Sequence, residues 1–121
     1  MQKIAVIDDD PDMLRMVVRM LKSGGYECLA YTAASEAMAS FGETGVDAIL
    51  TDVQMPGASV SDVIAAARSA RPGIPIIVMS GGRFAKSEAA ANVDGDVDGV
   101  LNKPFMRQEL LATMSRVLQA A

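Results

Sequence analysis

The fold of this chain follows from one stretch, which reads Asp47-Ala48-Ile49-Leu50-Thr51-Asp52-Val53-Gln54-Met55-Pro56-Gly57. Its apolar residues form a continuous run that ends on a carboxylate, Asp52, and a Pro-Gly turn follows. A short apolar run bounded by turn signals is typical of a strand that is covered on both faces. The sequence therefore places Asp52 at the carboxyl end of a buried strand. An acidic residue at such a position is, taken alone, usually a solvated turn residue.

Strand-like segments alternate with helical patterns along the whole chain. This alternation predicts βα units, a parallel sheet with right-handed crossovers, and helices on both faces of the sheet. No linker-like segment interrupts the pattern, so we expect one α/β domain over residues 1–121. The expected strands are residues 3–7, 26–31, 46–51, 74–80 and 99–102, and the expected helices are residues 12–23, residues 34–41, a segment between Ser59 and Arg71, and a C-terminal helix with Leu110, Leu111, Met114, Val117 and Leu118 on one face.

The first helix has a clear start and more apolar surface than one core-facing stripe needs. Asp10 is expected to be its N-cap, with Pro11 at the first helical position. Apolar residues at helical spacing predict which face packs on the sheet. The predicted core stripe is Met13, Met16, Val17 and Met20, and Leu14, Val18 and Leu21 extend the apolar surface beyond it.

Composition excludes several classes of function. The net charge of −4 argues against nucleic acid as a direct partner, because duplex binding depends on neutralising phosphates with Lys and Arg. The chain has no histidine, which excludes imidazole zinc sites, His-dependent triads and a phosphohistidine on this chain. The single Cys28 permits no internal disulfide and is expected to be a small buried residue.

No apolar run approaches the roughly 18 residues that span a bilayer. The chain also enters its first strand at Lys3, which leaves no room for a signal peptide before it. We therefore expect a cytoplasmic protein with no membrane contact.

Polar side chains follow the carboxyl ends of four expected strands: Asp8 and Asp9, then Asp52, then Ser80, then Lys103. In an open parallel sheet, ligands bind at these ends of the strands. Each residue has a plain structural interpretation, as a helix cap, a turn hydroxyl or a surface charge, but the set together does not. Three neighbouring carboxylates repel one another unless a cation joins them, and an all-oxygen site suits Mg²⁺. The pattern therefore predicts a Mg²⁺ site at this rim, and a bound Mg²⁺ would keep waters and share its shell with phosphate oxygens.

The same positions carry a resemblance that covers the whole chain. Four motifs, in this order, resemble those of response-regulator receiver domains: Ile7-Asp8-Asp9, Asp52-Val53-Gln54-Met55-Pro56-Gly57, Met79-Ser80-Gly81 and Lys103-Pro104-Phe105. The resemblance implies a flavodoxin-like, doubly wound (βα)5 fold with a five-stranded parallel sheet in the order 2-1-3-4-5. It also implies a phosphoacceptor in a two-component or phosphorelay system, rather than a conventional enzyme.

The resemblance implies a role for each rim residue. Asp52 would accept the phosphoryl group, Ser80 would hydrogen-bond that group, and Lys103 would pair with it. Such a domain catalyses its own phosphorylation and dephosphorylation. The bond between Lys103 and Pro104 is often cis in this family. The implied Mg²⁺ ligands are Asp9, Asp52 and the backbone carbonyl of Gln54, with Asp8 acting through water.

The implied partners are proteins. A histidine kinase or a histidine phosphotransfer protein would donate the phosphoryl group, and a downstream protein that the sequence does not name would receive the signal. We expect the donor to dock on the first helix at Leu14 and Val18; the alternative for these two residues is additional core packing.

Three features depart from the family pattern. Val100 stands where an aromatic residue is usual, so a switch based on a swinging ring is in doubt. Val60 follows the Asp52 motif where a glycine tolerates positive φ, so the turn is expected to take another path. Residues 81–97 have few apolar anchors, so a helix there is expected to be short or mobile. These departures keep a second hypothesis open, a receiver-like interaction module whose output does not depend on phosphorylation.

Overall fold

A computed structural model describes residues 2–55, 58–81 and 97–120 of the chain. Its main feature is a five-stranded parallel sheet in the order β2-β1-β3-β6-β7, which is the order 2-1-3-4-5 when only these strands are counted. The predicted flavodoxin-like fold is therefore confirmed. The strands are β1 (Lys3–Ile7), β2 (Glu27–Tyr31), β3 (Ala48–Asp52), β6 (Ile76–Ser80) and β7 (Gly99–Asn102).

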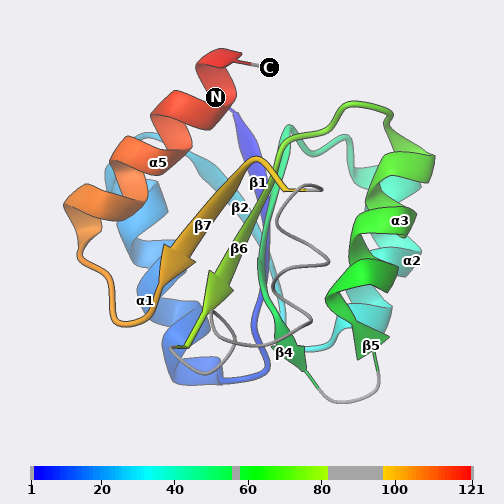
Figure 1. Ribbon diagram of the computed structural model, residues 1–121, viewed down its shortest axis with the longest axis horizontal. Coiled ribbons are helices and arrows are strands. Elements are labelled where there is room, and N and C mark those ends of the chain that lie inside the picture. Colours follow the sequence, from blue (N-terminus) through cyan, green and yellow to red (C-terminus); the bar gives the residue numbers. More distant parts are fainter. Residues whose placement is uncertain (1, 56–57, 82–96, 121) are drawn as a thin grey trace.

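Two layers of helices cover the sheet (Figure 1). Helices α1 (Pro11–Ser23) and α5 (Arg107–Ala120) lie on one face, and α2 (Ala34–Thr44) and α3 (Val60–Ala70) lie on the other. Alternate residues of each strand point to opposite faces, so the buried apolar residues in the described part of the chain form two clusters. Ile49 packs in the cluster on the α2 and α3 side, and Leu50 packs in the cluster on the α1 and α5 side.

The stretch that begins at Asp47 contains β3, the central strand of the sheet. All five of its residues are buried, and it pairs with β1 on one side and with β6 on the other. Asp52 is its last residue and lies opposite Met79 of β6. The sheet therefore holds this carboxylate between the ends of two neighbouring strands.

The segment between Asp52 and Val60 connects β3 to α3, and the turn expected to depart from the family pattern includes residues 56 and 57, which lie outside the described residues. Two short strands, β4 (Gln54–Met55) and β5 (Ala58–Ser59), pair in an antiparallel ladder with Gln54 opposite Ser59. Ser59 then caps α3 in a capping box with Asp62. Val60 begins this helix, and among the described residues only glycines have positive φ.

The predicted core stripe of α1 is wrong in part. The buried residues of this helix are Leu14, Val17 and Leu21, whereas Met16 is 41% exposed. The spacings of three and four residues place Leu14, Val17 and Leu21 on one line along the helix. Methionines on either side are therefore turned away from the sheet or only half-buried. The predicted cap at Asp10 is confirmed, because its side chain accepts hydrogen bonds from the backbone of Asp12 and Met13.

Three other predictions concern the length of α2, the burial of Cys28 and a helix in residues 81–97. Helix α2 is longer than predicted, since it continues to Thr44 and ends at Gly45 with a φ of 62°. Cys28 is only half-buried, because it lies on the edge strand β2. The expected short helix in residues 81–97 falls on a segment of which residues 82–96 lie outside the described residues. Within the described part of the chain, none of the helices has the length and hydropathy to cross a membrane.

Candidate functional site

The predicted rim residues meet at the carboxyl edge of the sheet. Strand β1 ends beside β3, and Asp8 and Asp9 follow directly after it. Asp52 ends β3, Ser80 ends β6, and Lys103 follows directly after β7. The parallel register brings these strand ends level with one another, which is why residues far apart in the sequence share one site.

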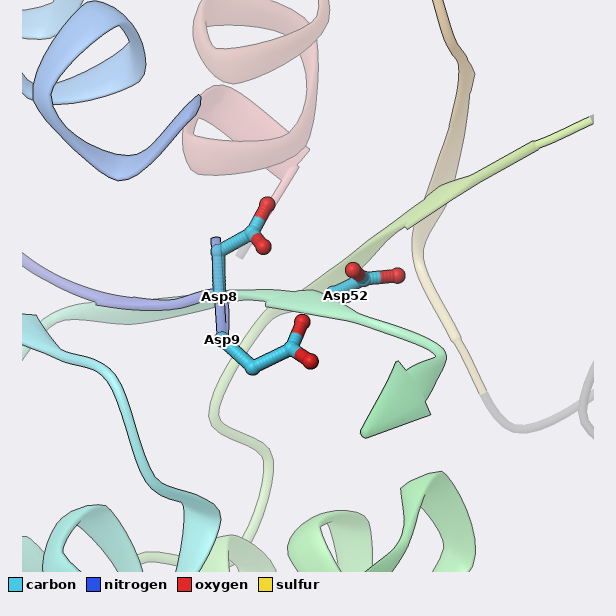
Figure 2. A group of neighbouring side chains, drawn as sticks. All are labelled: Asp8, Asp9 and Asp52. Atoms are coloured by element: carbon cyan, nitrogen blue, oxygen red, sulfur yellow. The ribbon is translucent and has the colours of Figure 1, made fainter. Parts of the chain in front are cut away.

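Three carboxylates form the acidic part of the site. Asp8, Asp9 and Asp52 each place a carboxylate oxygen within 4.8 Å of the others. Figure 2 shows two of these side chains on the chain that leaves β1 and the third at the end of β3. Asp8 is fully buried and Asp52 is 8% exposed, whereas Asp9 is exposed. An all-oxygen group with one side open to water is a donor set that suits Mg²⁺, which keeps part of its water shell.

Lys103 supplies the positive charge of the site. Its Nζ donates hydrogen bonds to Asp8 Oδ2 and to Asp52 Oδ2, each at 3.1 Å. Burial alone would lower the pKa of this ammonium, but the hydrogen bonds to Asp52 and Asp8 outweigh it, and the pKa of Lys103 is raised. The bond between Lys103 and Pro104 is cis, as the resemblance implied. Lys103 is thus a fixed cation that joins two of the three carboxylates.

Burial disfavours the ionised form of the Asp8 carboxyl group. Burial raises the pKa of its carboxyl group above the ordinary value of 3.8, although the backbone N–H of Asp10 and the Lys103 ammonium both oppose the rise. The folded protein therefore binds a proton at Asp8 more tightly than the unfolded chain does. It follows that the Asp8 contribution to stability falls as the pH rises from 3.8 through the higher pKa of the folded state.

We expect Asp8→Asn to raise the urea midpoint at neutral pH in the absence of divalent cations. The amide carries no charge that burial penalises, and Lys103 keeps its pairing with Asp52. Urea unfolding at a series of pH values should show a flatter profile than that of the wild type above pH 3.8. Asp12→Asn, which changes an exposed carboxylate of α1, is the matched control. A lower midpoint for Asp8→Asn at neutral pH would contradict this account.

Ser80 has a partner that the sequence did not indicate. The residue is fully buried, and its Oγ–H donates a hydrogen bond to Asn102 Oδ1 at 3.4 Å. Ser80 and Asn102 are direct partners in the register of β6 and β7. The only signal in the sequence is that Asn102 precedes Lys103, and strand register cannot be read from that.

The other residues singled out in the sequence lie on β4, β7 and α1. Gln54 begins β4, two residues after Asp52. Val100 is 41% exposed on the edge strand β7. Leu14 is buried in the core, whereas Val18 is half-buried. Both line a groove between α1 and β2, together with Ala30 and three basic residues, Arg15, Arg19 and Lys22.

Comparison with known proteins identifies the family. The model of the response regulator receiver domain matches residues 4–115. The chain belongs to this family. Receiver domains accept a phosphoryl group and interact with histidine kinases or phosphotransfer proteins. The acidic group described above is the kind of pocket in which receiver domains bind Mg²⁺.

Relatives and solved structures agree with this assignment. The receiver domain is 32% identical over 117 residues to the transcriptional regulatory protein PrrA of Mycobacterium tuberculosis, covering 97% of this chain and 50% of the relative. It is 33% identical over 117 residues to the response regulator MprA of Mycobacterium sp. (strain KMS), with the same coverage. The chain thus spans about half the length of the curated relatives that it matches. The chemotaxis response regulator CheY4 of Vibrio cholerae is 30% identical, with a TM-score of 0.83 over 97% of this chain and 98% of that one.

Proposed function

We propose that this receiver domain accepts a phosphoryl group on Asp52 from a phosphohistidine of a partner protein. One observation carries the proposal: the Asp52 carboxylate lies between a lysine ammonium at 3.1 Å and two further carboxylates. Phosphoryl transfer needs both a fixed cation and a metal site, because charge spreads over the phosphoryl oxygens in the transition state.

The proposed metal ligands come from three segments at the rim. Asp9, Asp52 and the backbone carbonyl of Gln54 would bind Mg²⁺ directly, and Asp8 would act through water. The different exposures support this division, since Asp9 faces solvent whereas Asp8 is buried and already holds Lys103. When bound, Mg²⁺ would neutralise the acidic group and the charge on the phosphoryl oxygens.

The proposed reaction is an in-line displacement at phosphorus. A carboxylate oxygen of Asp52 forms a bond to phosphorus, the bond from phosphorus to the histidine nitrogen breaks, and its electron pair returns to the imidazole. Lys103 holds the Asp52 carboxylate in position and pairs with a phosphoryl oxygen, and the Ser80 hydroxyl donates to another. Water can later attack the phosphorus in the same geometry, so that its bond to Asp52 breaks, inorganic phosphate leaves and the Asp52 carboxylate is regenerated. The domain would in this way catalyse both its own phosphorylation and its own dephosphorylation.

Trapping the acyl phosphate tests this function. The protein is incubated with acetyl phosphate and Mg²⁺ and then treated with borohydride, which reduces an aspartyl phosphate to homoserine. Peptide mapping by mass spectrometry should find homoserine at position 52, and only when Mg²⁺ is present. Homoserine at Asp8 or Asp9 instead would refute the assignment of the phosphoacceptor.

We further propose that the groove between α1 and β2 docks the phosphodonor. Its apolar lining and its three basic residues fit a partner helix that combines an apolar side chain with carboxylates. Leu14 is too deeply buried for a clean test, because a charge at that position would disturb the core. Val18, which is half-buried on the same groove, is the better probe.

Val18→Asp is expected to slow transfer from a phosphohistidine donor protein at least tenfold, because the new carboxylate removes apolar contact and repels an acidic partner. The rate with acetyl phosphate should stay unchanged, since that donor needs no docking surface. Met16→Asp is the matched control, because Met16 is exposed on the same helix but does not line the groove. Equal loss of transfer in both variants would argue against the groove.

A second candidate function is an interaction module whose output does not depend on phosphorylation. The exposed Val100 favours it, because an aliphatic side chain lacks the ring that usually reports the state of this site. Failure of the protein to form an acyl phosphate, with Mg²⁺ bound, would favour this second function.

A further inference from the structure

We propose that Asn102 is a positioning residue that reverses its hydrogen bond to Ser80 when Asp52 carries a phosphoryl group. The proposal rests on the proposed function, in which the Ser80 hydroxyl donates to the phosphoryl group. It assigns to Asn102 a role in setting how readily the site accepts that group.

The geometry makes Asn102 the neighbour that holds the Ser80 side chain. The two residues are direct partners across β6 and β7, and Ser80 Oγ–H donates to Asn102 Oδ1 at 3.4 Å. The backbone N–H of Lys103 also donates to the Ser80 carbonyl at 2.7 Å, which keeps the two strand ends together. Ser80 is fully buried, whereas Asn102 is exposed.

A hydroxyl group has one proton to donate and lone pairs that accept. In the structure, that proton is given to Asn102. A phosphoryl group on Asp52 would need the same proton for one of its oxygens, so the bond to Asn102 Oδ1 must be given up. The Ser80 oxygen can still accept, and the asparagine amide also carries an N–H₂ group.

Rotation of the Asn102 amide by half a turn would present Nδ2 to Ser80 Oγ. Because the side chain is exposed, no core packing has to move for this rotation. Asn102 would thus accept from Ser80 in the unphosphorylated state and donate to it in the phosphorylated state. An asparagine amide can accept from the Ser80 hydroxyl and can also donate to it, whereas an aspartate carboxylate can only accept.

Binding of beryllofluoride, a mimic of the phosphoryl group, provides the test with the full chain and Mg²⁺. Asn102→Asp should weaken beryllofluoride binding about tenfold or more, because two oxygens would then face each other without a proton between them, beside an anion. Asn102→Ala removes both the acceptor and the donor, so it should weaken binding by less. Gln108→Ala, which removes an exposed amide from α5, should leave binding unchanged.

A double-mutant cycle separates the hydrogen bond from the added charge. In a Ser80→Ala background the hydroxyl is absent, so Asn102→Asp should weaken binding only through charge, and its effect should be clearly smaller than in the wild type. Fluorine NMR gives an independent signature. The resonance of the fluorine that accepts from Ser80 should shift in Asn102→Asp and in Asn102→Ala, and stay in place in Gln108→Ala.

The outcomes distinguish this proposal from the proposed function. Equal losses from Asn102→Asp in both backgrounds, or wild-type affinity in Asn102→Asp, would overturn the role of Asn102 and leave Asp52 as the phosphoacceptor. If the wild type binds no beryllofluoride, or if Asp52→Asn binds it as well as the wild type does, the proposed function itself fails.

Discussion

Asp52→Asn is expected to abolish phosphorylation by acetyl phosphate and by a phosphohistidine donor. An amide oxygen is a poor nucleophile and cannot form the acyl phosphate, and the change also removes one of the two carboxylates proposed to bind Mg²⁺ directly. The fold should persist, because asparagine has nearly the same shape and Lys103 keeps its hydrogen bond to Asp8. Loss of all labelling, without loss of folding, is therefore the expected result.

Radiolabelled acetyl phosphate and circular dichroism on the same samples measure these two properties together. Asp12→Asn is the matched control, since it makes the same change at an exposed carboxylate of α1 and should be labelled like the wild type. Wild-type labelling of a folded Asp52→Asn protein would show that another residue is the phosphoacceptor.

Lys103→Met is expected to lower the rate of phosphorylation about 100-fold while raising the affinity for Mg²⁺. The rate falls because the phosphoryl oxygens lose a preorganised cation, an effect of the size found for single oxyanion donors. The affinity for Mg²⁺ rises because the ammonium that now shares Asp8 and Asp52 no longer repels the metal ion.

The opposite signs of these two effects make the result specific. Isothermal titration with Mg²⁺ gives the affinity, and the rate of acyl phosphate formation at saturating Mg²⁺ gives the chemistry. Arg116→Met, which removes an exposed cation of α5 outside the groove between α1 and β2, should change neither quantity. Weaker Mg²⁺ binding in Lys103→Met would mean that the lysine supports the acidic group instead of competing with the metal.

Much of the fold and of the rim could be predicted from the sequence, because both depend on local signals. The strand over residues 3–7 and the strand over residues 99–102 have the predicted bounds, since each is a compact apolar segment bounded by polar or turn residues. Asp8, Asp52 and Lys103 could be placed in one site because parallel strands end at one edge of a sheet. Lys103 Nζ lies 3.1 Å from Asp8 Oδ2 and 3.1 Å from Asp52 Oδ2, which confirms that the three side chains share one site.

Other features depend on tertiary packing and could not be predicted. Helix α1 has apolar residues over more than half of its circumference, so its pattern alone leaves its rotation open. In the folded protein the helix face that carries Leu14 packs on the sheet, and Met16 lies at the surface. The contact between Ser80 and Asn102 depends on the register of β6 and β7, which neither strand encodes by itself.

The pairing of β4 with β5 links the backbone two residues after Asp52 directly to the start of α3. Gln54 pairs with Ser59, and Ser59 is the residue that caps α3, so the ladder and the cap form one continuous set of hydrogen bonds. A displacement of the backbone at Gln54 would therefore be passed to the first turn of the helix instead of being absorbed by a slack loop. We therefore expect a change at Asp52 that moves Gln54 to change the position of the α3 N-terminus as well.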